Sequence, residues 1–525
     1  MQNSYDAVII GAGHNSLACA AHLAAKGWSV AVFEQAAIPG GAVKTGEFSA
    51  PGFRHDWGAM NLSLFAGSPF FGQYGPELQE NGLELAPVEN CFASVFPDGS
   101  WLGVSTDMAV TAKRIEAFSA RDAETWKDLV GNFPAEAEHL FGLLNMPMKK
   151  YAFASFVIKL LRKKGFSGSA DLGRFLMSSP RTWLTETFES NQVRAMLAAW
   201  GMHLDFAPDI AGGALFPYLE AMANQSFGMV LGKGGADTMI RALTAMIEKK
   251  GGVIECGARV ERVIHRDGQA SGIVLADGRE ITARRAVIAN VAPGALVDKL
   301  LSGQSGDTGY DRKMRAFSHA PGTMMLHLAM DALPGWSASE DLARFAYVHL
   351  APSMDQMART YAQAKAGLLP AEPVIVVGQP TAVDPSRAPE GKHVLWLQVR
   401  MAPATITGDA KGEIAACDWA EAAEPMTERA LDILDRYAPG VRSNIIARRI
   451  VTPLELETDN PNLVGGDQVC GSHHLSQHFL FRPALGRASG ATPIKNLHLI
   501  GAGVWPGAGV GAGSGYHLGQ KLAGA

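Results

Sequence analysis

The stretch that decides the fold is YDAVIIGAGHNSLACAAHLAAKGWSVAVFE, residues 5–34. Its apolar run Ala7–Ile10 contains no polar residue, which is typical of a strand buried on both faces. A Gly-Ala-Gly turn follows, and residues 15–26 then carry Ala and Leu at helical spacing, with a glycine just past the end. A second apolar run, Ser29–Phe33, leads directly into Glu34. The order strand, tight turn, helix, strand therefore fixes the first domain.

This order predicts half of a dinucleotide-binding βαβ unit. Gly11 permits the tight turn, and Gly13 lets backbone N–H groups approach a pyrophosphate at the N-terminus of the helix. Glu34 stands at the spacing from which a carboxylate accepts hydrogen bonds from an adenosine ribose. Ser16 occupies the third glycine position of the G-x-G-x-x-G pattern, so helix and strand have to pack around a hydroxymethyl group. An ordinary βαβ turn without a ligand is the alternative.

Length and composition limit the remaining choices. The chain has 525 residues, too many for one core, so two or three domains are expected. Its net charge of −5 gives no basic surface for nucleic acid. The five cysteines are dispersed and lack C-x-x-C or zinc-site spacing, which predicts reduced thiols of a cytoplasmic protein and no metal site. We expect neither a signal peptide nor a membrane-spanning helix.

A second glycine turn, Gly40-Gly41, lies close behind Glu34. An NAD-only domain has no special need of this turn, whereas a flavin cofactor does. His55 and Asp56 follow it, and we expect His55 near the ring of the cofactor. A structural pair that fixes the loop is an equal alternative.

Residues 66–227 have a mostly helical pattern, and one stretch within them is basic and amphipathic. In MKKYAFASFVIKLLRKKGF, residues 148–166, apolar side chains recur at i, i+3, i+4 and i+7 and are flanked by basic residues. Such a helix either lies in a membrane interface or packs its apolar face on the core. Both alternatives stay open, with Phe153 and Phe156 as the side chains that would enter a membrane.

The chain then returns to the first domain. Alternation in Val260–Ile264 and Ala270–Leu275 predicts a hairpin, and Ala286–Ala289 predicts a buried strand ending at Asn290. Residues 291–480 predict a mixed sheet suited to the wall of a substrate cavity. The expected domains are 1–65, 228–290 and 481–525 for the cofactor, 66–227 for a helical substrate- or membrane-facing region, and 291–480 for a mixed-sheet substrate domain.

The C-terminus carries a second signature, NLHLIGAGVWPGAGVGAGSGYHLGQKL, residues 496–522. A short strand, a run of glycines and a final helix predict backbone that approaches a large flat ligand, with the helix N-terminus aimed at it. We reject a flexible glycine-rich tail, because Trp505, Pro506 and the preceding strand are not tail composition.

Together the two ends resemble the FAD-dependent phytoene desaturase-like oxidoreductases, a branch of the amine oxidase and GDP-dissociation-inhibitor superfamily that includes the pyridine nucleotide-disulphide oxidoreductase domain proteins. The matching positions are residues 11–15, 34, 40–41, 232–236, 287–290, 466–467, 477, 482–483, 492–494 and 501–511. The chain departs from the family pattern at Ser16, Val504-Trp505, Ala508 and 515–517. The resemblance is weak between residues 67 and 227.

The resemblance implies an α/β fold with a Rossmann-like FAD-binding domain of the two-dinucleotide-binding type and non-covalent FAD. It implies hydride transfer from a carbon of an apolar substrate, of the carotenoid or isoprenoid type, to flavin N5, with oxygen or a quinone as electron acceptor. The expected cofactor-binding residues are Gly11, Gly13, His14, Asn15, Glu34, Gly40, Gly41, Val260, Asn290, Gly501, Gly503, Gly509 and Val510. An amine oxidase-like enzyme on a small C–N substrate and a non-redox lipid- or prenyl-binding protein remain as alternatives.

Catalytic residues are harder to choose. His474 and His478 are the candidates for proton transfer at neutral pH, and Trp505 and His55 are the candidates to line the flavin ring. Each of these four residues also has a structural interpretation. We expect a cytoplasmic protein, either free or peripheral to the membrane, in an oligomeric state that the sequence leaves open.

Overall fold

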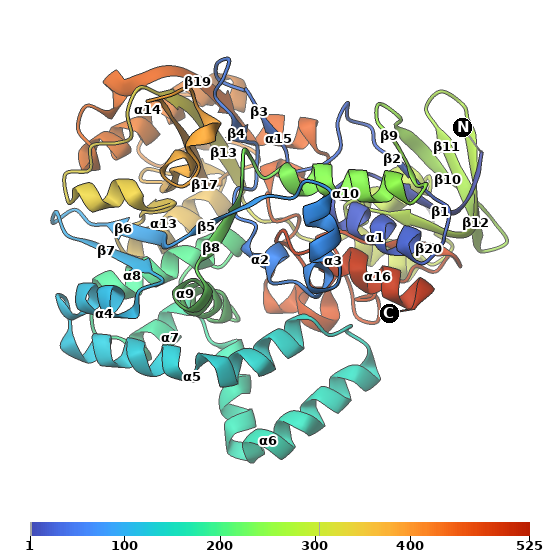
Figure 1. Cartoon of the computed structure of the whole chain (residues 1–525), viewed down its shortest axis with the longest axis horizontal. Helices are drawn as coiled ribbons and strands as arrows, with labels where there is room; N and C mark the ends of the chain where they lie inside the picture. The colour runs from blue at the N-terminus through green and yellow to red at the C-terminus, as the bar shows by residue number, and fades with distance from the viewer. Residues whose placement is uncertain (1–2, 304, 525) are drawn as a thin grey trace.

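The computed structural model describes residues 3–303 and 305–524. Two seven-stranded sheets lie side by side, as the right and left halves of Figure 1 show. The first sheet is built around the N-terminal strand, and the second comes from the middle of the chain. The predicted α/β class with two sheets is confirmed.

The first sheet joins segments that are far apart in the sequence. Its order is β10-β11-β12-β1-β2-β9, and β20 also pairs with β12. Its strands are β1 (Ser4–Ile10), β2 (Val30–Phe33), β9 (Val253–Glu255), β10 (Val260–Arg266), β11 (Gln269–Leu275), β12 (Glu280–Ala289) and β20 (Leu497–Leu499). β1 runs parallel to β2 and β12, and β20 runs parallel to β12. The predicted contribution of N-terminal, middle and C-terminal segments to one sheet is therefore present.

Both faces of the first sheet are buried. Ala7 and Ile9 of β1 pack with the helices α1 (His14–Ala25), α10 (Thr238–Lys249) and α16 (Gly513–Ala523), whereas Val8 and Ile10 pack in the core on the opposite face. The uninterrupted apolar run of β1 follows from this two-sided burial.

The second sheet has the order β19-β13-β17-β16-β14-β6-β7. Its strands are β6 (Asn90–Val95), β7 (Trp101–Ser105), β13 (Gly322–Met330), β14 (Tyr347–Leu350), β16 (Val374–Gly378), β17 (His393–Ala402) and β19 (Ile445–Val451). One face packs on α14 (Trp419–Tyr437) through an apolar core. β5 (Leu85–Val88), β6 and β7 lie within residues 66–227, so the helical interpretation of that segment misses three short strands. β5 pairs with β8 (Met229–Gly232), β6 pairs with β14, and β7 pairs with β6.

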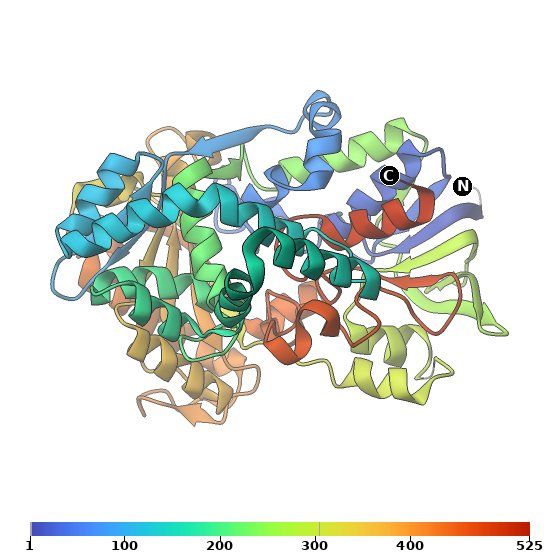
Figure 2. The same cartoon turned by 90° about the horizontal axis from the view of Figure 1, so that it is seen from below.

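The helical region lies below the second sheet and carries a bent, projecting helix (Figures 1 and 2). Its main helices are α4 (Met108–Glu116), α5 (Ala120–Leu144), α6 (Lys150–Met177), α7 (Pro180–Thr187), α8 (Asn191–Gly201) and α9 (Leu215–Phe227). α3 (Pro69–Glu80) precedes them in the sequence but packs with α10 and α16 beside the first sheet. α6 is interrupted at Gly165, whose φ is +69°. In the described part of the chain, no helix is long and apolar enough to span a membrane.

The apolar face of α6, for which the sequence left membrane contact and packing on the core as alternatives, turns inward. Phe153 and Phe156 are partly buried against neighbouring cores, Leu160 is buried, and Lys164 pairs with Glu136. The apolar stripe is therefore explained by packing. The large apolar side chains that α6 exposes are others, namely Tyr151, Ile158, Leu161, Phe166 and Met177.

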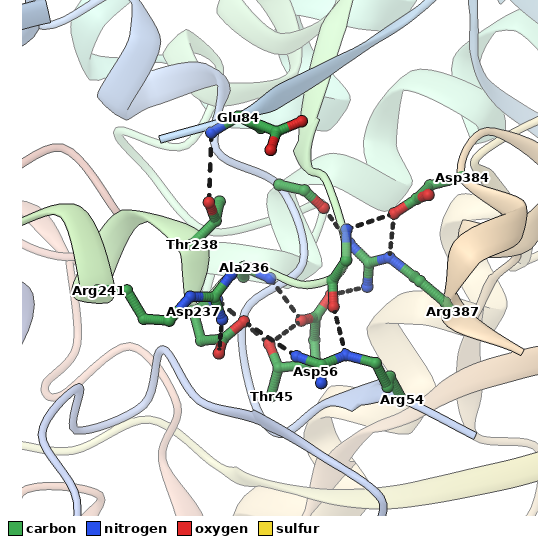
Figure 3. Close-up of polar contacts among 12 residues, drawn as sticks. Thr45, Arg54, Asp56, Glu84, Ala236, Asp237, Thr238, Arg241, Asp384 and Arg387 are labelled. Atoms are coloured by element: carbon green, nitrogen blue, oxygen red, sulfur yellow. Dashed lines mark hydrogen bonds and ion pairs between the residues drawn. The ribbon is translucent and has the colours of Figure 1, made fainter. Parts of the chain in front are cut away.

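A buried polar network joins the two halves of the molecule (Figure 3). The Asp56 carboxylate accepts from Thr45 Oγ1 (2.7 Å) and from the Ala236 N–H (2.8 Å) and forms an ion pair with Arg387. Arg387 also donates to the Gly232 carbonyl (2.7 Å). Asp56 is thus structural, as one of the two sequence interpretations held.

Candidate functional site

Two glycine turns meet at the C-terminal ends of β1 and β2. The Gly40 N–H donates to the Ala12 carbonyl (2.9 Å), and a Cβ on Gly41 would lie 3.4 Å from the Gly13 Cα. Gly40 has a φ of +126°, and a Cβ there would lie 2.4 Å from the Val43 carbonyl oxygen. Side chains are thus excluded from a cradle of exposed backbone, which is what a closely bound dinucleotide requires.

Two helices begin at this cradle without a side-chain cap. α1 starts after Gly13 and α16 starts after Ala512, and neither has a capping side chain. By contrast, the Ser68 hydroxyl caps α3. At the start of α16 the Gly515 N–H donates to Asn15 Oδ1 (3.4 Å), and the other N–H groups at the starts of the two helices have no capping side chain and can meet an anionic or carbonyl-bearing ligand.

Direct contacts hold the two helix starts together. The Asn15 Oδ1 accepts from Ser514 Oγ (3.0 Å), which itself accepts from the Gly501 N–H (2.9 Å). A Cβ on Gly515 would lie 1.8 Å from the Asn15 carbonyl oxygen. Gly515 therefore allows the start of α16 to pack directly against the backbone of α1.

Asn290 explains the presence of a serine at position 16, where the dinucleotide-binding fingerprint has a glycine. The Asn290 Nδ2 donates to Ser16 Oγ (2.9 Å) and would lie 3.1 Å from a Cβ on Gly13. Its Oδ1 would lie 2.1 Å from a Cβ on Gly501. The Ser16 hydroxyl is therefore a hydrogen-bond acceptor that fixes the end of β12 between the N-terminal and C-terminal glycine segments.

Glu34 lies at the end of β2, as predicted. Its Oε2 accepts from the Ala12 N–H (2.6 Å) and its Oε1 from the Ala36 N–H (2.9 Å). The Ala258 N–H donates to the Glu34 carbonyl (2.8 Å), which brings the start of β10 and Val260 alongside. Each carboxylate oxygen keeps a lone pair for a ribose hydroxyl.

His14 and the other predicted cofactor residues border the same cradle. The His14 ring bonds to the Gly509 backbone, and burial lowers its pKa to about 4, so the ring is neutral. A Cβ on Gly509 would lie 2.6 Å from Leu64, and one on Gly503 would lie 2.9 Å from Pro293. Val510 packs in the core beside α16.

Trp505, His478 and His473 form one buried cluster next to the C-terminal glycines. The Trp505 indole contacts the His478 ring at 5.2 Å and donates to the Met146 carbonyl (2.9 Å). The His473 Nε2 accepts from the Ala508 N–H (2.9 Å). Burial, helped by Arg482, lowers the pKa of His478 to about 3, which is poorly matched to proton transfer at neutral pH.

His474 and His55 lie outside the cluster of Trp505, His478 and His473. The His474 Nε2 is 3.2 Å from the buried Asp205 carboxylate. His55 bonds to Ser49 Oγ (2.6 Å) and its ring lies 5.4 Å from that of His327 on β13. Burial lowers the pKa of His55 to about 3. The described contacts of His55 include none with the C-terminal glycines, so its placement near the ring stays a prediction.

Sequence reasoning missed several polar residues of the second sheet, among them His327, His349, Gln398 and Arg400. One signal was available: in HVLWLQVRMA of β17, Trp396, Gln398 and Arg400 alternate with apolar residues.

No group of three or more His, Cys, Asp or Glu residues within 3–303 and 305–524 is arranged to hold a metal ion.

Known proteins resemble this chain over nearly its whole length. The chain is 26% identical to the mouse (Mus musculus) pyridine nucleotide-disulfide oxidoreductase domain-containing protein 2, covering 97% of this chain and 92% of the relative. It is 27% identical to a phytoene dehydrogenase of Streptomyces griseus, covering 96% and 92%. The solved structure of an oxidoreductase from Methanosarcina mazei matches with a TM-score of 0.63 at 19% identity over 98% of both chains, which shows a shared fold.

The family itself follows from a profile match. The profile described as flavin containing amine oxidoreductase matches residues 17–415, well over half of the chain. The protein is therefore a member of the flavin-containing amine oxidoreductase family and an oxidoreductase.

Proposed function

We propose that the protein binds FAD non-covalently and oxidises a bond at a carbon of a largely apolar substrate. One observation carries the proposal: the glycine cradle, the uncapped starts of α1 and α16 and the Glu34 carboxylate are held within one site. Here α1 would hold the pyrophosphate, Glu34 the ribose, and the start of α16 the flavin ring. When bound, FAD supplies a two-electron acceptor for a hydride from the substrate. The similarity to a phytoene dehydrogenase supports this reading.

The visible absorption spectrum of the purified protein tests the cofactor. We expect flavin bands that pass into the supernatant when the protein is denatured by heat. Flavin that stays with the denatured protein would mean a covalent link. Absence of flavin after reconstitution with FAD would favour a non-redox lipid-binding protein.

Glu34→Ala tests the proposed geometry. Loss of hydrogen bonds to a charged acceptor costs about 1.5–3 kcal/mol, so we expect FAD to bind about ten- to a hundredfold more weakly. Glu47→Ala, at an exposed position nearby, is the matched control and leaves FAD binding unchanged. Equal affinity of the two variants contradicts the assignment of Glu34.

A second candidate is oxidation of an amine. The family profile that matches the chain, described as flavin containing amine oxidoreductase, supports this candidate. Anaerobic bleaching of the flavin by alkylamines but not by apolar alcohols or acids would select this candidate.

A further inference from the structure

One face of the second sheet carries buried polar side chains with atoms that have no hydrogen-bond partner. We call it the polar face; it comprises Ser94, His327, His349, Trp396, Gln398 and Arg400. Register places His327 opposite Trp396, and Gln398 in the same row as His349 and Ser94. The six residues thus lie on four strands of the sheet, with Val376 of β16 between His349 and Gln398 in the same row.

The opposite face of the same strands is wholly different. Leu326 and Leu328 of β13 and Leu395, Leu397 and Val399 of β17 belong to the apolar core beneath α14. Because side chains alternate between faces, the polar residues are gathered on one side of the sheet. Leaving a buried polar atom unpaired costs free energy, so such a concentration calls for a ligand or ordered water.

Four of the unpaired atoms on or beside the polar face can only donate a hydrogen bond. The indole Nε1 of Trp396 and the Nε of Arg400 can only donate, and neither finds an acceptor. The same holds for Trp57, stacked on His327 at 5.8 Å, and for Trp200, whose ring lies 5.1 Å from His349. Gln398 Oε1 is the one unpaired atom among these side chains that can only accept. A group rich in acceptors would complete this set.

Arg400 adds a buried positive charge. Its guanidinium donates to Thr323, to Gln468 and to the carbonyls of Met202 and His203, at 2.7–3.2 Å. Burial lowers its pKa only to about 10, and the carboxylates of Asp467 and Asp205 favour its charged form, so it stays cationic at neutral pH. None of the ion pairs among the described residues involves Arg400 directly. An anion in hydrogen-bond contact would therefore stabilise this buried charge further.

The polar face is continuous with the cofactor site. Gln468 bonds to both Gln398 (2.8 Å) and Arg400 (3.2 Å), and its Nε2 would lie 3.9 Å from a Cβ on Gly58. Gly58 in turn abuts the Ala42 carbonyl, next to the Gly40-Gly41 turn. This chain of contacts links the polar face to the Gly40-Gly41 turn.

We propose that the polar face binds a carboxylate of the substrate, which makes the substrate an apolar acid and not a hydrocarbon. This inference rests on the proposed function, whose apolar substrate it specifies. One cation supplemented by neutral donors matches a single negative charge, which favours a carboxylate over a diphosphate.

Ligand binding to the purified, flavin-loaded full chain tests the inference without turnover. Palmitate, hexadecanol, hexadecylamine and farnesyl diphosphate are titrated by calorimetry, with tryptophan fluorescence as a second readout. We expect palmitate to bind at least tenfold more tightly than the other three. Arg400→Gln and Trp396→Phe should each weaken palmitate binding at least tenfold and leave hexadecanol binding unchanged. His393→Phe, on β17 but outside the polar face, should bind palmitate normally.

Equal binding of palmitate and hexadecanol, or preference for the amine or the diphosphate, would overturn the carboxylate assignment. If Arg400→Gln fails to fold, Trp396→Phe decides, because it removes the indole N–H and keeps a smaller aromatic ring at the same position. The two proposals fail separately. Palmitate binding without flavin refutes the redox function, and flavin without palmitate selectivity refutes the polar-face assignment.

Discussion

Arg387 and Asp56 form an ion pair in which neither side chain is more than 1% exposed. Asp56 belongs to the first domain's β3–β4 pair (Thr45–Gly46 and His55–Asp56), and Arg387 belongs to the segment that precedes β17. Arg387 also reaches Gly232 and Asp384. This pair is therefore the polar link between the domain with the cofactor cradle and the sheet with the polar face.

Removing one partner of this pair should be strongly destabilising. Arg387→Leu leaves the Asp56 carboxylate buried and unpaired, which costs about 3–5 kcal/mol. Urea unfolding followed by circular dichroism measures the loss. Lys233→Ala, which breaks an exposed ion pair in the same glycine turn, is the matched control and should leave the unfolding midpoint unchanged. A similar midpoint for both variants would contradict a structural role for the buried pair.

Gly515→Ala should separate α16 from α1. The new Cβ would lie 1.8 Å from the Asn15 carbonyl oxygen, a backbone atom that cannot rotate away. We expect a loss of about 1–3 kcal/mol from overpacking, together with loss of bound flavin. In Gly511→Ala the nearest atom to the new Cβ is 3.8 Å away, so this variant should keep its flavin. Flavin retained by both variants would argue against the α1–α16 contact as part of the site.

The stability should depend on pH through Glu220. Burial raises its pKa to about 7, so the folded state holds this proton more tightly than the unfolded state. Stability from this group is therefore greatest below its unfolded pKa and falls as pH rises toward 7. Glu220→Gln should gain about 1–3 kcal/mol relative to wild type between pH 5 and pH 8. Urea unfolding at pH 5 and pH 8 measures this difference in stability, and Glu248→Gln, at an exposed position, is the control. If the stability of Glu220→Gln changed with pH in the same way as that of the wild type, the role of Glu220 would be contradicted.

His474 is the better of the two histidine candidates for proton transfer. It lies 3.2 Å from the Asp205 carboxylate, whereas the low pKa of His478 keeps that ring neutral. His474→Gln should lower kcat by about a hundredfold or more, without loss of flavin. His478→Phe should retain most activity over the same pH range. Unchanged turnover and an unchanged pH profile in His474→Gln would remove it from the reaction.

Membrane contact, if α6 makes it, should use the side chains that this helix exposes. Tyr151 is 92% exposed and Phe166 83%, and the exposed Lys159 and Arg162 lie between them in sequence. We propose that this surface binds acidic lipid. Flotation with phosphatidylserine liposomes should recover the wild type, and Tyr151→Asp combined with Phe166→Asp should abolish recovery. Leu485→Asp, at an exposed site outside α6, is the control. Failure of the wild type to float would end the proposal.

The first sheet was predictable because its signals are local. The run Ala7–Ile10, the glycine turns and Glu34 each reflect what one short segment needs, and the hairpin of β10 and β11 is visible in its alternation. β6 and β7 were not predictable in the same way, since the pairing of β6 with β14 joins residues far apart in the sequence. The α6 stripe shows the same limit: periodicity identifies an apolar face and not what covers it.

The residues of the site also differ in how far local sequence predicts them. The sequence predicted Gly11, Gly13, Glu34, Gly40, Gly41, Asn290 and Gly501 because backbone approach and strand ends leave marks in composition. It did not predict that Asn290 donates a hydrogen bond to Ser16, or that Arg387 forms an ion pair with Asp56, because these contacts arise from tertiary packing. The histidine roles were the least predictable, since burial decides their pKa values.

The first sheet has one further consequence, which concerns synthesis of the chain. β20 and α16 complete the cradle, yet they come from residues 497–523, whereas β1 and α1 are made first. Almost the whole polypeptide must therefore leave the ribosome before the cofactor-binding cradle is complete. We therefore expect the cofactor to bind after translation, once α16 has packed against α1. Until then the glycine turns of the N-terminal segment are expected to lack the cofactor.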